Sequence, residues 1–262
     1  MTFLINPYRF AAAYDTDAQA YITAVEAADG QALETGVRDA INAFVVGCKA
    51  DGIWTAIKAS CILAGARTLA GALVPLVGTA PTNNNFVSGD YNRETGLAGD
   101  GSTKRLNSNC AHSNCPKNNG HISVYASSPH TTASRAYMYA LGSSIFTAMI
   151  STTASPPDAW IMHDSGSSVP RFTDNASAGF RGVQRSDSTS FSYRTGGTTT
   201  SVTRGVGTGT PGTETFWIYA IGDGTFYSDA RLAFYSIGES LDLFLLDSRV
   251  STLLTAIAAA IP

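Results

Sequence analysis

Charged residues are scarce in this chain. Asp, Glu, Lys and Arg make up 14% of its 262 residues, against roughly a quarter in a typical soluble protein. The net charge is −3, and no stretch concentrates lysine and arginine. Because a nucleic-acid-binding protein needs a basic surface to neutralise phosphates, the composition argues against nucleic acid as a partner.

A secretory leader and a long apolar run are also lacking. The opening MTFLI carries no basic residue before Asn6 and Pro7 interrupt it, so we expect no signal peptide. The longest apolar run, residues 69–78, is too short to cross a membrane and contains Pro75. We therefore expect a protein made in the cytoplasm, with no membrane partner.

Catalytic motifs are missing from the sequence as well. There is no G-x-S-x-G, and the dipeptide His163-Asp164 would place its two side chains on opposite faces of a strand, which does not build a triad. The carboxylates available for glycoside hydrolysis stand mostly beside Gly or Pro, where Asp favours turns; they are Glu94, Asp100, Asp158, Glu214 and Asp223. We predict no enzyme and no cofactor.

A helical period is present in residues 11–78. Thr16 opens a capping-box pattern, and Gly30 is placed to end the helix that follows. A second helix and a third element, capped by Asp51, are predicted from apolar residues three and four apart. The three stripes are Ala18, Tyr21, Ile22 and Val25; Leu33, Val37, Ala40, Ile41, Phe44 and Cys48; and Ile53, Trp54, Ile57 and Cys61.

The C-terminal residues predict one more helix. Ser240 is its expected cap, and Asp242 suits the positive end of the helix dipole. One apolar stripe contains Leu243, Leu246, Val250, Leu253, Leu254, Ile257 and Ile261. We expect this stripe to pack against the N-terminal helices or a sheet, with an oligomer seam as the alternative.

From about residue 83 the apolar period shortens toward two, and turn residues recur every eight to twelve positions. Strands are predicted at residues 121–127, 136–141, 145–152, 159–163, 190–195, 215–221 and 231–237. Hairpin turns are predicted at Gly196-Gly197 and at Gly222-Asp223-Gly224. No helix-length segment separates these strands, so the sheets should be antiparallel. The chain then divides into an N-terminal arm and helical module at 1–80, a β-sandwich at 81–239 and a C-terminal helix at 240–262.

Three phrases resemble a known family. They are NPYRF at residues 6–10, LVPLVGTAPTNNNFVSGDYNRETGLAGDGSTKRLNSN at 73–109 and ARLAFYSIGESLDL at 230–243. They resemble the bracketing segments of the concanavalin-like (laminin-G-like) β-sandwich of tailed-phage virion proteins. The resemblance implies a mostly β fold, an antiparallel concanavalin-like jelly-roll sandwich, and a place on the virion surface. It leaves ligand and chemistry open.

Cys110, His112 and Cys115 form one local cluster that invites chemistry. Three zinc ligands are present, but a fourth at matching spacing is missing. A disulfide between Cys110 and Cys115 is favoured over zinc, because four intervening residues allow the approach of the two Cα atoms and the implied virion surface is oxidising. Two free thiols are the open alternative. Cys48 and Cys61 lie on apolar stripes and are expected in the core.

Two further groups of residues are candidates for ligand contacts. Oxygen-rich loops at residues 83–85, 88–92 and 98–102 offer calcium ligands, although turn formation explains the same composition. Aromatic residues of the predicted strands alternate in and out, and the outward ones are placed to stack on sugar rings. The aromatic residues of these strands, of which at least half are expected in the core, are Trp160, Phe191, Tyr193, Phe216, Trp217 and Tyr219.

These observations predict a non-enzymatic phage virion surface protein. We expect an adhesin or tail-fibre-type component that contacts host-surface polysaccharide, with other virion proteins as partners and several copies or a homo-oligomer on the particle. The first alternative is a capsid decoration or cement protein that bridges neighbouring subunits. The second is a polysaccharide-degrading enzyme of the same architecture.

Overall fold

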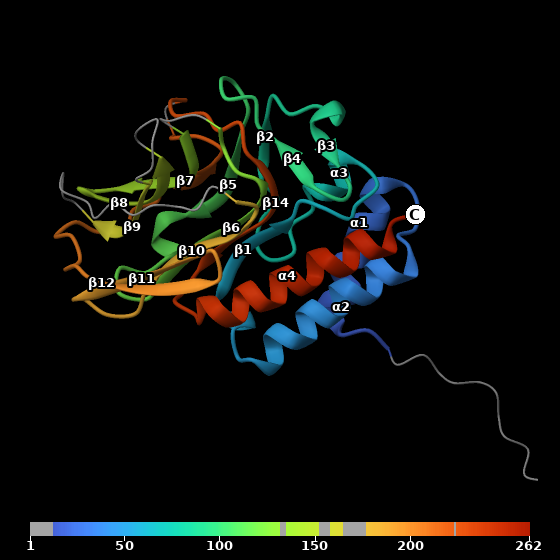
Figure 1. Ribbon diagram of the computed structural model, residues 1–262, viewed down its shortest axis with the longest axis horizontal. Coiled ribbons are helices and arrows are strands. Elements are labelled where there is room, and N and C mark those ends of the chain that lie inside the picture. The colour runs from blue at the N-terminus through green and yellow to red at the C-terminus, as the bar shows by residue number, and fades with distance from the viewer. Residues whose placement is uncertain (1–12, 132–134, 152–157, 165–176, 223) are drawn as a thin grey trace, which may run out of the picture.

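The computed structural model describes residues 13–131, 135–151, 158–164, 177–222 and 224–262. In this part of the chain, two antiparallel sheets pack face to face, and helices from both ends of the chain lie together beside one of them (Figure 1). The predicted fold class is confirmed: the protein is a mostly β antiparallel sandwich of the jelly-roll type, with an N-terminal helical module and a C-terminal helix.

The first sheet has eight strands. Its spatial order is β12 (Thr198–Thr203), β11 (Ser190–Thr195), β10 (Gly179–Arg185), β6 (Gly120–Ser128), β14 (Arg231–Gly238), β4 (Gly96–Ala98) and β3 (Tyr91–Asn92), and β1 (Ile57–Ile62) also pairs with β14. Gly196 and Gly197 join β11 to β12 with φ of 54° and 77°. Since two positive φ values in a row suit glycine, the predicted hairpin turn is confirmed there.

The second sheet has six strands. Its order is β2 (Thr82–Asn84), β5 (Arg105–Ala111), β13 (Thr215–Ile218), β7 (Arg135–Gly142), β8 (Ile145–Ser151) and β9 (Asp158–Asp164). Alternate residues of both sheets meet in a buried layer between them, for example Leu106 and Ile218 from this sheet and Val124 and Ile237 from the other. This layer holds the two sheets together, because it removes their apolar faces from water.

The outer face of the eight-stranded sheet is covered by helices. These are α1 (Thr16–Asp29), α2 (Thr35–Ala50), the short α3 (Leu69–Ala72) and α4 (Leu243–Ala260), and single 3₁₀ turns η1 (Trp54–Ala56), η2 (Ser88–Asp90) and η3 (His112–Asn114) lie in the connections. α2 and α4 run side by side (Figure 1). Their stripes share one core with Phe180 and Phe234 of the sheet.

The predicted stripe of α4 faces inward. Leu246 and Val250 are fully buried, and Arg249 pairs with Asp51 at the end of α2, with Nε and Oδ2 2.7 Å apart. By length and composition alone α4 would also suffice to cross a bilayer. Here its apolar side packs against α2 and β10.

The helix ends differ slightly from the sequence-based expectation. Asp15, not Thr16, caps α1, and Gly30 ends it in the left-handed conformation as expected. Asp242, not Ser240, caps α4, because its carboxylate accepts from the backbone N–H groups of residues 244 and 245. Both corrections move the cap by one or two residues and leave the helices in place.

The prediction of a third helix, based on the stripe of Ile53, Trp54, Ile57 and Cys61, is wrong. Residues 57–62 form β1, which pairs antiparallel with β14, and η1 is a single turn before it. The strand is buried on both faces, with Ile57 against the helices and Cys61 in the layer between the sheets. A strand buried on both sides has apolar residues at nearly every position, so its spacing is easily mistaken for a helical stripe.

Candidate functional site

The outer face of the six-stranded sheet carries the most distinctive hollow. In β13, Phe216 and Ile218 point into the buried layer between the sheets, so Trp217 faces outward. Tyr139 of β7 is the cross-strand partner of Trp217 in the ladder, and it faces the same way. The strand alternation thus places two aromatic rings side by side on a sheet face that the helices do not cover.

A pocket of about 670 Å³ opens over these rings; we call it the aromatic pocket. Its apolar lining comes from Tyr139, Leu141, Trp217 and Ile221, and its polar lining includes Ser143, Thr213, Glu214 and Thr215. Leu141 is 48% exposed. Glycines 142, 212 and 222 complete the described wall and bring backbone groups close to the opening.

The indole of Trp217 is held from two directions. The guanidinium carbon of Arg105 lies 4.4 Å from its ring centroid, and Nη1 of Arg105 donates to the Gly222 carbonyl at 3.1 Å. A Cβ on Gly222 would lie only 2.8 Å from the indole Nε1, so the backbone packs directly against the ring edge. The ring is therefore preorganised, which reduces the entropy lost when a ligand stacks on it.

The loop that carries Glu214 is equally well anchored. Ser143 and Thr210 exchange two backbone hydrogen bonds, of 3.1 and 3.2 Å. The backbone N–H of His112 donates to the Glu214 carbonyl at 2.7 Å, and that of Ser113 donates to Gly212 at 2.9 Å. Glu214 itself is exposed at the pocket rim. A fixed backbone thus presents a solvated carboxylate beside the aromatic floor.

This combination suits a sugar. The faces of aromatic rings stack on the C–H faces of a sugar ring, while rim hydroxyls and a carboxylate accept and donate hydrogen bonds at its edge. Among the described lining residues, Glu214 is the one carboxylate. The described lining therefore offers stacking and hydrogen bonding, with one carboxylate where glycoside hydrolysis uses two facing acids.

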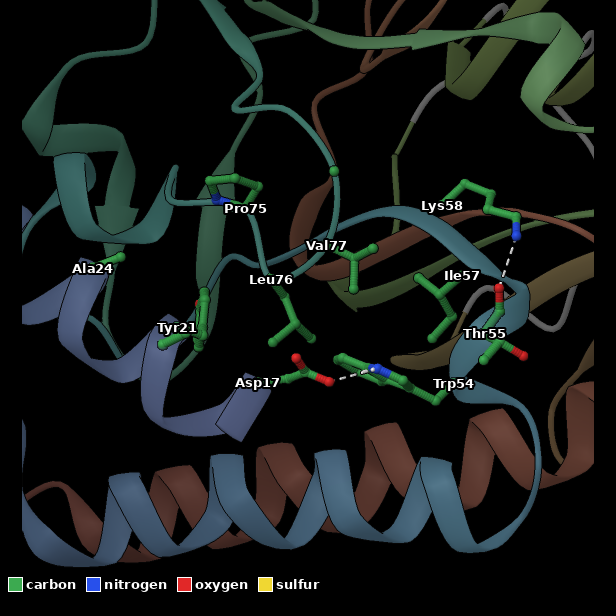
Figure 2. Close-up of a pocket in the computed structure, with 12 residues that line it drawn as sticks. Asp17, Tyr21, Ala24, Trp54, Thr55, Ile57, Lys58, Pro75, Leu76 and Val77 are labelled. Atoms are coloured by element: carbon green, nitrogen blue, oxygen red, sulfur yellow. Dashed lines mark hydrogen bonds between the residues drawn. The ribbon is translucent and has the colours of Figure 1, made fainter. Parts of the chain in front are cut away.

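A second hollow, of about 650 Å³, lies between α1, η1 and residues 75–78; we call it the helix-side groove (Figure 2). Its walls are mainly apolar, and two of its polar side chains, those of Trp54 and Lys58, are engaged with neighbours. Nε1 of Trp54 donates to Asp17 at 3.1 Å, and Nζ of Lys58 donates to the Thr55 carbonyl at 2.9 Å (Figure 2). Nζ of Lys58 also pairs with Glu239 at 3.0 Å. Tyr21 is buried, so Trp54 is the one partly exposed ring among the described groove residues, and the groove is the poorer site for stacking a sugar.

The cysteine cluster predicted from the sequence lies inside the fold. Cys110 and Cys115 are free, buried thiols, and burial raises the pKa of both. His112 is buried with its Nε2 2.9 Å from the Thr147 hydroxyl, and burial lowers its pKa to about 4. Within the described residues, no three His, Cys, Asp or Glu side chains come together as metal ligands. The disulfide between Cys110 and Cys115 stays a prediction.

His163 and Asp164 are both buried, and they interact with different neighbours. The His163 ring stacks on His112 with centroids 5.2 Å apart, whereas Asp164 accepts two hydrogen bonds from the Arg204 guanidinium, of 2.5 and 3.1 Å. Burial lowers the pKa of His163 to about 3. A histidine held neutral in this way and stacked on another ring contributes to packing.

Neither Glu94 nor Asp100 lines the aromatic pocket. Glu94 lies in the exposed turn between β3 and β4. Asp100 accepts from three backbone N–H groups and the Thr103 hydroxyl of its own loop. Burial by itself would raise the pKa of this carboxyl, but the bonds together outweigh burial and lower the pKa. This saturated carboxylate favours the turn over a calcium site at residues 98–102. Asp158 begins β9, and Asp223 lies outside the described residues.

Of the aromatic residues singled out in the sequence, Trp217 is the one placed in the pocket. Phe191, Phe216 and Tyr219 are buried, Tyr193 is half-buried, and the side chain of Trp160 lies outside the described residues. Sequence reasoning missed Tyr139 and Arg105. Tyr139 occupies an alternate position of a predicted strand, which is a usable signal, whereas Arg105 lies on a strand that the sequence did not predict.

Comparisons with known proteins add little to this geometry. No family model and no curated protein matches the chain. Among solved structures, it is similar to the crystal structure of the HCR/D F1240A mutant, with 11% identity and a TM-score of 0.46 over 75% of this chain and 50% of that one. It thus spans half of that structure's length.

A second similar structure is domain 4 of AbnA, a GH43 extracellular arabinanase from Geobacillus stearothermophilus, in complex with arabinotriose. The identity is 13% and the TM-score 0.40, over 68% of this chain and 82% of that one. At these identities and scores, neither protein's ligand informs on the ligand of this chain.

Proposed function

We propose that this chain is a non-enzymatic surface protein that binds glycan in the aromatic pocket. The observation that carries the proposal is the pair of outward rings, Tyr139 and Trp217, on adjacent strands with the polar rim of Ser143, Thr213 and Glu214 beside them. Exposed apolar groups framed by polar ones mark binding sites more often than unused surface.

The expected affinity of one pocket is weak. One or two stacked sugar rings and a few solvent-exposed hydrogen bonds typically give millimolar to micromolar dissociation constants. Several linked copies raise the apparent affinity by roughly 10²–10⁴ without new contacts. This arithmetic suits a protein carried in many copies, such as an adhesin on the virion surface, the location that the sequence resemblance implies.

The test is a binding titration of the isolated protein against a panel of oligosaccharides and purified host-surface polysaccharide. Trp217→Ala should abolish measurable binding. Trp54→Ala is the matched control, because it removes the half-buried indole of the helix-side groove and leaves the aromatic pocket intact. Equal binding by the wild type and Trp217→Ala would refute the proposed site.

The enzyme alternative has its own readout in the same experiment. New reducing ends after prolonged incubation with the polysaccharide would show hydrolysis, and would replace the binding proposal. The location is tested separately, by mass spectrometry of purified phage particles and by imaging where on the particle the chain lies. The cement alternative would be favoured if particles become fragile without the protein and if neither the isolated protein nor the intact particle binds glycan.

A further inference from the structure

We propose that the aromatic pocket selects uncharged glycans over anionic ones, and that Glu214 is the residue that sets this selectivity. The inference rests on the proposed glycan-binding function and names its ligand class. It follows from how charge is distributed around the pocket, not from the stacking platform, which any sugar ring with a C–H face would use.

Glu214 is the one charged side chain among the described residues that line the pocket. It is exposed, and no described lysine or arginine forms an ion pair with it. Its backbone is held by the bond from His112 to its carbonyl, so the carboxylate stays near the rim. The described lining therefore presents one carboxylate, without an ion-pair partner among the described residues, to whatever enters.

Arg105 is the described cation that contacts the Trp217 ring at the floor of the pocket. Arg105 is not part of the pocket lining; its guanidinium lies 4.4 Å from the Trp217 centroid and 6.0 Å from that of Tyr227. Its Nη1 donates to the Gly222 carbonyl. The described lining thus supplies no arginine fork of the kind that proteins use to recognise carboxylate or sulfate groups on sugars.

The two ligand classes then meet different interactions. The hydroxyl or amide N–H groups of an uncharged sugar donate to the Glu214 carboxylate, and such charge-assisted hydrogen bonds are stronger than neutral ones. A uronic acid or sulfated sugar brings a like charge to the same rim. We expect wild-type protein to bind the uncharged form at least about tenfold more tightly. A repulsion between like charges, or the loss of one charge-assisted hydrogen bond, typically changes affinity by about this factor.

The experiment compares a neutral oligosaccharide that binds the protein with the same oligosaccharide after oxidation of its primary alcohols to carboxylates. Wild type should prefer the neutral form, Glu214→Gln should narrow the difference, and Glu214→Lys should reverse it. Glu94→Gln is the matched control, because it neutralises an exposed glutamate in the β3–β4 turn and should keep the wild-type preference. In wild type, high salt should also reduce the discrimination by screening.

The outcomes separate this inference from the proposed function. If wild type binds the oxidised form as tightly as the neutral one, or if Glu214→Gln keeps the full preference, the charge selection is wrong and glycan binding still stands. If no saccharide of either form binds wild type, the proposed function itself fails. Near-ultraviolet circular dichroism of each variant confirms that the fold is retained, and the salt series on wild type tests the inference without any variant.

Discussion

The two outer faces of this sandwich are built from similar strands, but helices cover one face and do not cover the other. On the eight-stranded sheet, Ile62, Phe180 and Phe234 are covered by α1, α2 and α4 and belong to one core with them. On the six-stranded sheet, Tyr139 and Trp217 also point outward, but they border an open pocket. An aromatic side chain on one face is a packing residue, and on the other it is available to a ligand.

This difference separates stability from recognition within one fold. Burying a large apolar side chain contributes about 1.5–3 kcal/mol, so the helix-covered face should dominate the free energy of unfolding. The outer face of the six-stranded sheet has only a small buried cluster, Ala136, Ala148 and Ile150, against which Tyr139 packs, so its contribution to stability should be smaller. Changes on the two faces should therefore have different readouts, and the predictions below run from the largest expected effect to the smallest.

Leu246→Asp should unfold the protein. Leu246 is fully buried in the shared core of α4 and the sheet, so the variant would bury an unpaired carboxylate at a cost of at least ~4 kcal/mol. Ser248→Asp, on the exposed side of α4, is the control and should melt like wild type. Circular dichroism melts measure both, and equal melting temperatures would show that α4 contributes little to the fold.

Phe234→Ala and Trp217→Ala compare an outward aromatic residue from each sheet. Phe234 is fully buried and meets Phe44 edge-on, with ring centroids 5.8 Å apart. Its loss should cost about 3–5 kcal/mol because a cavity remains. Because Trp217 is half-buried, Trp217→Ala should lower the free energy of unfolding by only about 1–2 kcal/mol, from the buried apolar area that is lost. The same substitution should abolish glycan binding. Urea unfolding measures both losses of unfolding free energy. A larger loss for Trp217→Ala than for Phe234→Ala would contradict the contrast between the two faces.

Acid should destabilise the folded protein through three buried histidines, His112, His121 and His163. Burial lowers the pKa of His112 and His121 to about 4 and that of His163 to about 3. Unfolded histidine titrates near ~6.5, so these groups bind protons on unfolding below that pH. The stability they confer is complete above pH ~6.5 and falls on acidification by about 1.4 kcal/mol per histidine and pH unit, until the folded pKa is reached.

Urea midpoints at pH 7.5, 6.0 and 5.0 measure this effect. His121→Gln should flatten the pH dependence by one histidine's share, because glutamine does not titrate. A midpoint that is constant from pH 7.5 to 5.0 would mean that the three rings are accessible to protons in the folded protein.

Glu214→Gln should have the smallest effect on stability. The side chain is exposed on the open face, and substitutions at such positions usually change stability by less than about 0.5 kcal/mol. Its consequence should be confined to ligand choice. Differential scanning fluorimetry measures the melting temperature, and a drop as large as that of Phe234→Ala would place Glu214 among the structural residues.

Local patterns predicted much of this fold. The stripes of α1, α2 and α4 follow from apolar residues three and four apart, and β6, β7, β8, β11 and β14 follow from strand periodicity bounded by turns. The prediction failed at β1, whose two buried faces look like a helical stripe. It missed β5, β10 and β12, where polar residues or glycines dilute the alternation.

The candidate site was less predictable than the fold. Trp217 was singled out as one of several aromatic residues, but periodicity does not tell which face of a sheet a helix will cover. Glu214 was considered as a turn carboxylate, while Arg105 carried no local signal. Arg105, Tyr139, Trp217 and Glu214 come from β5, β7, β13 and the loop before β13, so their proximity depends on long-range strand pairing.

The sequence by itself determined the helical and strand segments, the lack of a basic surface and the missing catalytic motifs, because these depend on neighbours within a few positions. The tertiary structure alone decided that α1, α2 and α4 cover the eight-stranded sheet, that β1 joins β14, and that the outward rings of β7 and β13 stay open. Those outcomes depend on contacts between residues distant in the chain, where burial on one face is gained only when the whole sandwich has formed.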